Sequence, residues 1–411
     1  MSEPLHVIVV GGGAAGLLAA GCAARRGYAV TVVERNARPA RKVMITGKGR
    51  CNVTNDSSVD ECIANIPGNG RFLYSTLSAF TPQDTVRLIE ELGVPLKTER
   101  GKRVFPVSDK AVDVVDALVK YAKSGGARFV TGRVTKLVIE DDVCCGVELE
   151  DGRVLSSYAV IVCTGGCSYP TTGSTGDGYA LARQAGHTII EPRPSLVPLV
   201  IRESYCADMQ GLSLKNCSLS VFDTEKNKTI FEDFGEMLFT HFGVSGPLVL
   251  SAGAHIREMR AGRYRLSIDL KPALTAEQLD ARLVRECEEK PNMCVGNMLG
   301  AVLPRSMVAP MLAAANVAGE TKCHSLSREA RQRLGATLKA FTLTVEDFRP
   351  IAEAIVTAGG VCTKEINSKT MASRLVSGLS FAGEVIDVDA YTGGFNLQIA
   401  FSTGYAAGNY I

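Results

Sequence analysis

The chain of 411 residues has almost no net charge, because 45 Lys and Arg residues stand against 43 Asp and Glu residues. Proteins that bind nucleic acid through its phosphates usually present a strongly basic surface, so we expect no nucleic-acid partner. The sequence also lacks a signal peptide and any apolar run long enough to span a bilayer. These absences predict a cytoplasmic protein without membrane contact.

The thirteen cysteines form no Cys-x-x-Cys pair, and no group of Cys and His has the spacing of a zinc site. Cys144 and Cys145 are adjacent, and Cys163 and Cys167 are four residues apart, which matches no common dithiol redox motif. Reduced cysteines in such a chain pack as small hydrophobic residues. We therefore expect neither a metal site nor a disulfide-reductase activity.

The length predicts two or three domains. Residues 5–10 (LHVIVV) read as a buried strand, 14–26 as a helix of small residues and 29–34 (AVTVVE) as a second strand. This is a β-α-β unit of the expected size. The N-terminal part of the chain is therefore predicted to be an α/β domain.

After a proline-dense stretch at 191–199, the pattern changes. Residues 197–271 hold several short strands and predict a small β domain. Residues 275–342 are mostly helical, and α/β texture returns from about residue 345. The order of these segments predicts a dinucleotide-binding domain interrupted by a large insertion.

A glycine-rich turn joins the first strand to the first helix, with Gly11, Gly13 and Gly16 at the spacing G-x-G-x-x-G. The first glycine allows a tight turn, the second lets backbone amides approach a pyrophosphate, and the third lets helix and strand pack closely. Glu34 ends the next strand, where its carboxylate can accept hydrogen bonds from a ribose diol. Strand, helix and acid together predict a dinucleotide site.

Two later segments favour FAD over NAD as the bound dinucleotide. The strand 159–166 (AVIVCTGG) ends in Thr-Gly-Gly, and 379–387 (LSFAGEVID) is an apolar strand that ends in Gly383 and Glu384, with Asp387 nearby. Each alone would be an ordinary buried strand with a turn, but together and in this order they are typical of FAD enzymes. The chain has one G-x-G-x-x-G fingerprint, at Gly11–Gly16, and therefore no separate NAD(P)H domain is expected. Any NAD(P)H is expected to visit the flavin transiently as a reductant.

The chain resembles the bacterial YhiN/BaiN-type flavoprotein family along its whole length. The segments that carry the resemblance are 44–55 (MITGKGRCNVTN), 163–178 (CTGGCSYPTTGSTGDG), 236–247 (EMLFTHFGVSGP) and 378–398 (GLSFAGEVIDVDAYTGGFNLQ). The resemblance implies one non-covalent FAD and an α/β fold. It further implies a Rossmann-type FAD-binding domain of residues 1–192 and 345–411, interrupted by a β-barrel at 193–272 and a helical part at 273–344.

The resemblance also implies which residues hold the cofactor. Those expected at the adenosine and pyrophosphate are Gly11, Gly13, Ala14, Ala15, Gly16, Glu34, Arg35, Val134, Thr164, Gly165, Gly383, Glu384 and Asp387. Those expected along the ribityl chain and the flavin ring are Lys42, Met44, Gly49, Arg50, Cys51, Asn52, Gly393, Gly394, Phe395, Asn396 and Gln398. A helix beginning near Asn396 is expected to point its N-terminal amides at the reduced flavin. Lys48, Ala390 and Ile399 differ from the residues that the family usually has at these positions. These differences affect the expected surroundings of the flavin and the substrate.

Two residues are candidate catalytic groups. Arg50 has a fixed guanidinium that can stabilise anionic oxygens, and His241 can supply a proton. The alternative for His241 is a histidine that hydrogen-bonds the backbone and shapes its loop. Cys51 is either a thiol beside the flavin or a small buried residue, and the second interpretation is favoured. The basic run Lys97–Arg103 is either a clamp for an NADPH phosphate or, as we favour, a solvated face.

The family includes reductases of double bonds conjugated to a steroid ketone and amine oxidases of the aminoacetone type. We therefore expect an FAD-dependent oxidoreductase acting on a small-molecule substrate. The favoured activity is reduction of an activated carbon–carbon double bond, possible alternatives being amine oxidation and non-enzymatic flavin binding.

Overall fold

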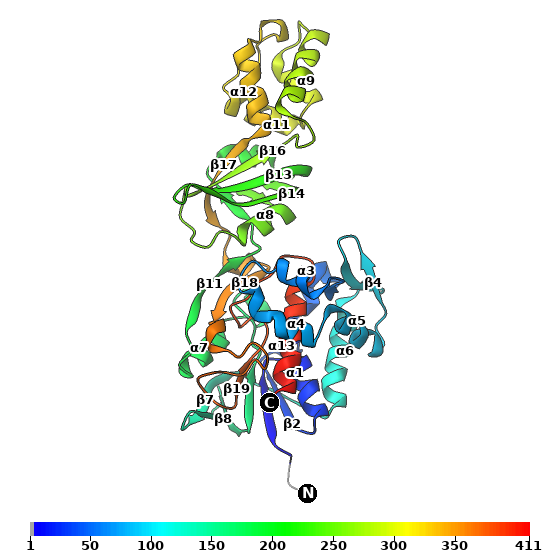
Figure 1. Cartoon of the computed structure of the whole chain (residues 1–411), viewed down its shortest axis with the longest axis vertical. Helices are drawn as coiled ribbons and strands as arrows, with labels where there is room; N and C mark the ends of the chain where they lie inside the picture. The colour runs from blue at the N-terminus through cyan, green and yellow to red at the C-terminus, as the bar shows by residue number, and fades with distance from the viewer. Residues whose placement is uncertain (1–3) are drawn as a thin grey trace. The chain divides into compact units, whose positions relative to one another are not determined.

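The structure is a computed structural model that describes residues 4–411. It divides into two compact units. The first comprises Met1–Ser195 and Pro350–Ile411, and the second comprises Leu196–Arg349 (Figure 1). The unit between the two halves of the first is the insertion that interrupts the chain.

The first unit is built around a parallel sheet of five strands in the order β19-β10-β1-β2-β6. Its strands are β1 (His6–Val10), β2 (Ala29–Glu34), β6 (Arg128–Thr131), β10 (Ala159–Val162) and β19 (Leu379–Phe381). In β1 and β10 nearly every side chain is buried, as parallel strands covered on both faces require. Such continuous apolar runs explain why the sequence alone predicts both strands.

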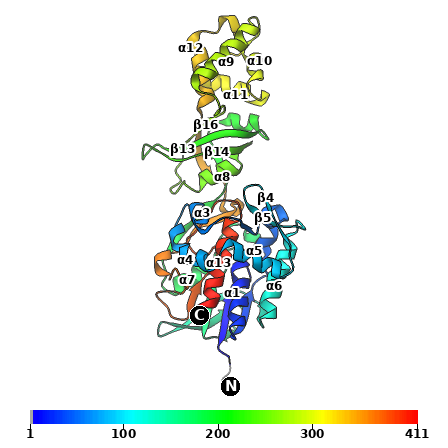
Figure 2. The ribbon, with the colours of Figure 1, turned by 45° about the vertical axis from the view of Figure 1, so that its right-hand side comes forward.

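Three helices lie side by side in this unit, namely α1 (Ala14–Arg25), α6 (Ala111–Ser124) and α13 (Phe395–Asn409) (Figure 2). Helices α1 and α13 approach closely because glycines face α1. A Cβ atom at Gly404 would lie 2.4 Å from the carbonyl oxygen of Ala15, and one at Gly408 would lie 2.4 Å from that of Ala19. The C-terminal helix therefore packs directly against the helix that follows the glycine-rich turn.

Smaller sheets and short helices complete the first unit. The sheets are β3-β5-β4, β7-β8-β9 and β11-β18, all antiparallel. Their strands are β3 (Thr54–Asn55), β4 (Leu96–Glu99), β5 (Arg103–Pro106), β7 (Val134–Glu140), β8 (Val143–Leu149), β9 (Val154–Ser156), β11 (Ile189–Ser195) and β18 (Val356–Val361). The remaining α-helices are α2 (Arg41–Ile45), α3 (Val59–Ala64), α4 (Tyr74–Ala79), α5 (Pro82–Glu91) and α7 (Asp177–Gln184).

The second unit contains a closed barrel of six strands in the order β12-β15-β14-β13-β16-β17. They are β12 (Leu199–Ile201), β13 (Ser213–Asp223), β14 (Lys228–Thr240), β15 (Gly243–Ser245), β16 (Tyr264–Asp269) and β17 (Phe341–Phe348). Alternate residues such as Leu219, Val221 and Leu266 are fully buried, as the two-residue period of a strand predicts. The expected division at residue 344 falls inside β17, because the chain returns from the helices to close the barrel.

The helices of the second unit are α8 (Pro247–Gly253), α9 (Ala276–Glu289), α10 (Val295–Met298), α11 (Arg305–Ala315) and α12 (Arg328–Lys339). Helix α9 starts with a capping box, in which the Thr275 side chain accepts from the Gln278 N–H and the Gln278 side chain accepts from the Thr275 N–H. Its buried Leu279 and Leu283 join the same core as the barrel.

The architecture confirms the predicted fold class, a Rossmann-type α/β domain interrupted by a β-barrel and helices. Over residues 4–411, no helix combines the length and the apolar character needed to cross a membrane.

Candidate functional site

The loops predicted to bind the cofactor meet at the carboxyl edge of the parallel sheet. Strand β1 pairs with β2 on one side and with β10 on the other, so the strand order reverses beside it. The N–H of Cys163 donates to the carbonyl of Val10 at 2.8 Å, and the N–H of Ala382 donates to that of Val162 at 3.0 Å. Ligands of open α/β sheets bind at such a reversal.

Close contacts explain two of the three glycines of the turn. Gly11 has φ +100°, and a Cβ there would lie 2.6 Å from the Cys163 carbonyl oxygen; one at Gly16 would lie 1.9 Å from the Gly11 carbonyl oxygen. A Cβ at Gly13, in contrast, meets nothing within 4 Å. Gly11 and Gly16 are therefore required by packing, whereas Gly13 faces open space at the start of α1.

That open space has the electrostatics of an anion site. Gly13 is the N-cap of α1, no side chain caps the helix, and its first turn contains no acidic residue. Gly383 approaches from the other end of the chain, where a Cβ would lie 3.0 Å from the Cβ of Ala15. Uncapped N–H groups and the positive end of the helix dipole favour a phosphate.

Glu34 binds the backbone of the same turn. Its Oε2 accepts from the Gly12 N–H at 2.8 Å, and its Oε1 accepts from the N–H and Nδ2 of Asn36 at 2.8 and 2.7 Å. Oε1 thus has two donors and Oε2 has one. Since each carboxylate oxygen can accept about two hydrogen bonds, Oε2 retains an acceptor position for a ribose hydroxyl.

Among the predicted cofactor residues in the described part of the chain, two have a buried polar atom without a hydrogen-bond partner, the Asn52 Oδ1 and the Thr164 Oγ1. Buried polar groups are normally paired, and both residues were predicted to face the cofactor. The open cradle at Gly13, the available Oε2 of Glu34 and these two atoms fit a dinucleotide such as FAD.

Lys42 and Glu384 come together beside this cradle. The Lys42 Nζ donates to Glu384 Oε2 at 2.7 Å and to the Ser168 Oγ at 2.6 Å. Glu384 Oε1 also accepts from the Thr357 N–H at 2.8 Å. This network ties α2 to the loops that follow β10 and β19. Sequence reasoning named Lys42 and Glu384 but missed Ser168 and Thr357, whose residue types carry no signal outside their fold.

Arg50 lies over the ring of Phe105, with its guanidinium carbon 4.1 Å from the ring centroid. The guanidinium also donates to Glu99 and to Asp109. Arg50 lowers the pKa of the Glu99 carboxyl, and Lys97 together with Arg50 lowers that of Asp109. Arg50 therefore holds the 46–52 loop against β5, and its catalytic role stays a prediction.

Cys51 is fully buried, with φ +60° and its N–H donating to the Thr46 carbonyl at 3.0 Å. Burial raises the pKa of its thiol to about 12. A thiol that stays protonated at neutral pH is a poor nucleophile. The geometry gives Cys51 a packing role in a tight loop.

Helix α13 begins at Phe395, one residue before the position expected from sequence, and Gly394 is its N-cap. A Cβ at Gly394 would lie 2.3 Å from the carbonyl oxygen of Thr54, so this glycine permits close contact with β3. Asn396 uses its side chain within the chain, since Oδ1 accepts from the Ala390 N–H at 2.9 Å and Nδ2 donates to the Ala390 carbonyl at 2.8 Å.

The Gln398 side chain is engaged within the chain, and its contact with the flavin stays a prediction. Its side chain is 1% exposed, and Oε1 accepts from the hydroxyls of Thr54 at 2.6 Å and Thr85 at 2.8 Å. Nε2 donates to the Phe80 carbonyl at 3.1 Å and to the Ser402 Oγ at 3.0 Å. All four hydrogen-bonding positions of the amide are filled, so the side chain joins α13 to α5 and β3.

Other predicted cofactor residues are distributed around the same edge. Arg35 donates to Asp177 at 3.2 Å, and Arg133, next to Val134, binds the same carboxylate with two donors at 2.9 Å. Asp387 accepts from the Asn69 Nδ2 at 2.9 Å. Met44 packs against the core, and Gly165 and Gly49 adopt positive φ.

His241 is exposed on the turn between β14 and β15 in the second unit, and its ring contacts that of Phe242. The neighbouring helix α8 is capped by Gly246. The catalytic role of His241 stays a prediction.

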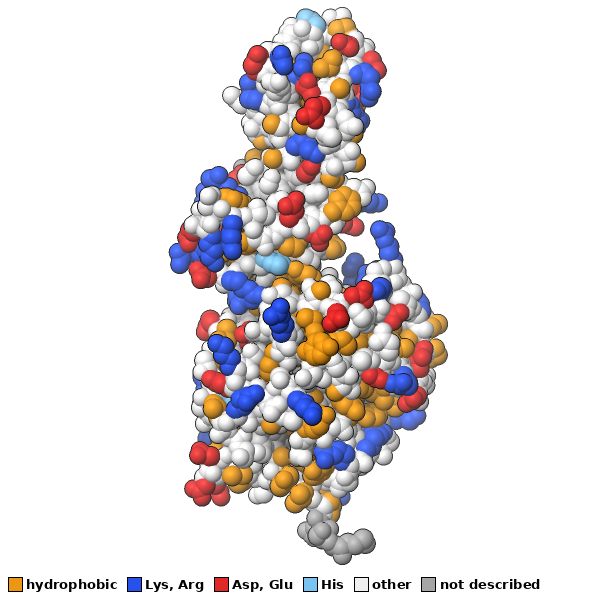
Figure 3. All heavy atoms as spheres, in the orientation of Figure 1, with side chains coloured by type: hydrophobic (Ala, Val, Ile, Leu, Met, Phe, Trp, Pro, Cys, Tyr) orange, Lys and Arg blue, Asp and Glu red, His pale blue; other side chains and the backbone are white. Residues whose placement is uncertain are grey.

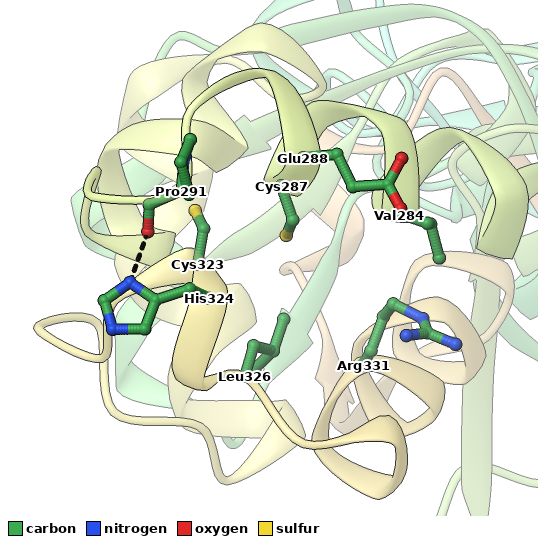
Figure 4. Close-up of a pocket in the computed structure, with 8 residues that line it drawn as sticks. All are labelled: Val284, Cys287, Glu288, Pro291, Cys323, His324, Leu326 and Arg331. Atoms are coloured by element: carbon green, nitrogen blue, oxygen red, sulfur yellow. Dashed lines mark hydrogen bonds between the residues drawn. The ribbon is translucent and has the colours of Figure 1, made fainter.

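The helical part of the second unit has a pocket of about 270 Å³ (Figure 4). Its polar groups are largely engaged: Arg331 binds Asp280 at 2.7 and 3.1 Å, and the His324 Nδ1 lies 2.8 Å from the Pro291 carbonyl oxygen. Burial raises the pKa of the Cys287 thiol to about 11. The pocket thus lacks the convergent, available polar groups of a reaction site. Residues 4–411 contain no group of three or more candidate metal ligands.

Comparisons with known proteins identify the family. A family model described as the HI0933-like protein Rossmann domain matches residues 5–410. The ribosomal RNA dihydrouridine synthase of Escherichia coli (strain K12) is 30% identical over 404 residues, which are 98% of this chain and 97% of that protein. The 3-dehydro-bile acid delta(4,6)-reductase of Clostridium scindens is 31% identical over 405 residues, 97% of each chain.

Among solved structures, 3-ketosteroid delta1-dehydrogenase from Sterolibacterium denitrificans in complex with 1,4-androstadiene-3,17-dione aligns with a TM-score of 0.50 and 13% identity, covering 99% of each chain. At this identity the likeness concerns the fold alone. Since the family model spans nearly the whole chain and both relatives cover it at 30% identity or more, this protein belongs to the HI0933-like family of FAD-dependent Rossmann-fold oxidoreductases.

Proposed function

We propose that this protein reduces a carbon–carbon double bond conjugated to a carbonyl group. The observation that carries the proposal is the chemistry shared by two relatives of nearly equal similarity. Making dihydrouridine saturates the C5–C6 bond of uridine, which is conjugated to the C4 carbonyl. A delta(4,6)-reductase of a 3-dehydro steroid acts on double bonds conjugated to the 3-ketone. The common element is a C=C–C=O group.

The residues proposed to hold FAD lie in the first unit. The turn Gly11–Gly16 and the start of α1 would bind the diphosphate, and Glu34 would bind the ribose through its Oε2. When bound and reduced by a visiting NAD(P)H, FAD would supply a hydride, that is, two electrons and one hydrogen. The second hydrogen of the saturated bond would arrive as a proton from solvent or from a protein acid. Asn52 and Thr164 offer the cofactor an acceptor and a hydroxyl.

The protein's own residues stabilise the negative charge that develops on the substrate. As a conjugated bond is reduced, negative charge develops on the carbonyl oxygen, so a fixed donor there lowers the barrier. Arg50 and His241 are the two candidates proposed for this donor. Arg50 lies on the 46–52 loop. Its charge is partly offset by its ion pairs with Glu99 and Asp109. The uncapped first turn of α13 is proposed to favour the anionic end of the reduced cofactor.

The test is an anaerobic single-turnover experiment with the reduced holoprotein. One arm uses a uridine-containing RNA and a second uses a 4-en-3-one steroid, and the saturated form of each serves as control. We expect flavin absorbance to return with at least one conjugated substrate and with neither saturated one, and mass spectrometry to show two added hydrogens. Arg50→Gln should slow this step at least tenfold more than Lys97→Gln, which removes a cation from the same carboxylate cluster on the neighbouring strand β4.

The result that overturns the proposal is equally specific. A protein whose reduced form ignores both conjugated carbonyls, but whose oxidised form is reduced rapidly by a primary amine and then reoxidised by oxygen, would be an amine oxidase.

A further inference from the structure

Arg133 follows strand β6 at the edge of the sheet where Glu34 ends β2. Strands β2 and β6 pair in parallel, with Glu34 opposite Thr131. One residue further on, the Gly132 N–H donates to the Glu34 carbonyl at 3.0 Å. Arg133 is therefore the next residue after the one that is bonded to the backbone of Glu34.

Two carboxylates fix the Arg133 guanidinium. Its Nε and Nη2 donate to the two oxygens of Asp177, both at 2.9 Å, and its Nη1 donates to Glu150 at 3.3 Å. The bidentate contact with Asp177 holds the planar group in one orientation. Each guanidinium nitrogen thus has a carboxylate partner along the edge of the group, while the side chain is still 40% exposed. What the group offers a ligand is mainly its flat face.

The surroundings of Arg133 carry balanced charge. Arg35 donates to Asp177 at 3.2 Å and to the Thr175 hydroxyl at 2.6 Å. Two cations therefore stand with two carboxylates, those of Asp177 and Glu150. On the face of the first unit drawn in Figure 3, basic and acidic side chains are likewise interspersed. A phosphate is attracted by unbalanced positive charge, whereas a guanidinium plane stacks on neutral aromatic rings and bases. The balanced group favours a neutral ring over an anion.

We propose that the adenine ring of bound FAD stacks on the flat face of Arg133, and that Asp177 is the positioning residue that holds this face in place. The inference rests on the cofactor of the proposed function and specifies the residue that recognises its adenine half. Adenine is bonded to the ribose whose hydroxyl is assigned to the Glu34 Oε2. The ring therefore lies beside this edge of the sheet, where Arg133 follows β6. Such a contact selects FAD over FMN, because FMN has no adenine.

The experiment compares the dissociation constants of FAD and FMN for the full chain, measured by the quenching of flavin fluorescence as the flavin-free protein is titrated. ADP, which carries the adenine half alone, is the third probe and competes with FAD. The test variants are Arg133→Leu, which removes the guanidinium, and Arg133→Lys, which keeps the charge but not the plane. The matched control is Lys136→Met, at an exposed ion pair on β7.

The dissociation constants of FAD and ADP should rise at least about fivefold in both Arg133 variants, as expected for the loss of a stacked cation. The constant of FMN should stay within about twofold of the wild type, since FMN does not reach Arg133. Asp177→Asn should give a smaller loss that is again confined to FAD and ADP, because the plane is held less firmly. Lys136→Met should bind all three ligands as the wild type does. Tm and FMN binding establish that each variant is folded.

Three results would overturn the inference. An unchanged FAD constant in a folded Arg133→Leu protein would place the adenine elsewhere. An equal loss of FAD and FMN would mean that Arg133 supports the fold of the site and makes no contact with adenine. Wild-type affinity in Arg133→Lys, together with a loss in Arg133→Leu, would indicate a charge contact with a phosphate instead of stacking.

Failure of the inference is distinguishable from failure of the proposed function. FAD binding that depends on Arg133, in a protein that reduces no conjugated carbonyl, refutes the function and supports the adenine contact. Reduction of a conjugated carbonyl by an Arg133→Leu protein that binds FAD as tightly as the wild type supports the function and refutes the adenine contact.

Discussion

Lys42 and Glu384 are 342 residues apart in sequence, yet the Lys42 Nζ lies 2.7 Å from Glu384 Oε2. Their side chains are only 21% and 20% exposed. The Thr357 N–H and the Ser168 hydroxyl share Glu384 Oε1. The pair therefore connects the N-terminal half of the first unit to its C-terminal half.

Removing one partner of this pair should cost more than removing both. Lys42→Met leaves a partly buried carboxylate with fewer donors, and should lower the free energy of unfolding by about 1–3 kcal/mol. The double variant Lys42→Met/Glu384→Gln should recover part of that loss, giving a coupling of at least about 1 kcal/mol in urea unfolding. The exposed pair Lys136 and Glu148 is the control, with an expected coupling below about 0.5 kcal/mol. Equal couplings for both pairs would contradict this account.

Gly13→Ala should separate cofactor binding from folding. The backbone of Gly13 has φ −79°, which alanine adopts, and its Cβ would enter open space. The apoprotein should keep its stability to within about 1 kcal/mol, while FAD binding weakens at least tenfold because the methyl occupies the phosphate cradle. Equilibrium dialysis and thermal unfolding of the apoprotein measure the two effects.

The matched variant is Gly16→Ala, whose Cβ would lie 1.9 Å from the Gly11 carbonyl oxygen. It should destabilise the apoprotein itself, as forced backbone shifts do, by more than about 3 kcal/mol. If Gly13→Ala retained FAD as the wild type does, the cradle would not hold the diphosphate.

Glu34→Gln should weaken FAD binding by about 1.5–3 kcal/mol, since a charge-assisted hydrogen bond to the ribose is lost. The amide also places a donor where Glu34 accepts from either the Gly12 or the Asn36 N–H. The dissociation constant of FAD is the measurement, and Glu140→Gln on an exposed strand end is the control. An unchanged constant in a folded Glu34→Gln protein would show that the ribose is held elsewhere.

Because of the Cys51 thiol, the free energy of unfolding should decrease at alkaline pH. Burial raises the thiol pKa to about 12 in the folded protein, whereas an unfolded thiol has a pKa near 8.5. The folded state thus retains a proton that the unfolded state releases, so this contribution is complete below about pH 8.5 and falls as pH rises toward 12, by about 1.4 kcal/mol per unit.

Urea unfolding of Cys51→Ala at pH 8 and pH 10 should show a smaller decrease than the wild type. Cys145→Ala, at a partly exposed cysteine, should not change the slope. Native Cys51 should also resist alkylation at pH 8, and rapid labelling would contradict its buried, protonated state.

The candidate site residues show what local sequence patterns do not predict, namely the partners that each side chain finds in the folded chain. Arg50 was selected because its position in the MITGKGRCNVTN segment suggested a flavin contact, but Glu99 and Asp109 come from strand β4 and the loop after β5. The resemblance predicts that Gln398 lies over the flavin, and the structure shows that its amide also binds Thr54, Thr85 and Ser402. No spacing rule contains such partners, because they converge from separate elements.

The sequence alone determined the β-α-β turn, the acid at the end of β2 and the cofactor class. These features are local: a buried strand, three glycines and a helix occupy consecutive residues, and each has a short-range steric reason. Tertiary structure decided which side chains remain available, because hydrogen-bond saturation depends on contacts across the whole chain. The hydrogen bonds of the Asn55 amide to Gly101, between β4 and β5, and to Gly393 form only once the halves of the first unit have packed together, as does the Lys42 and Glu384 pair.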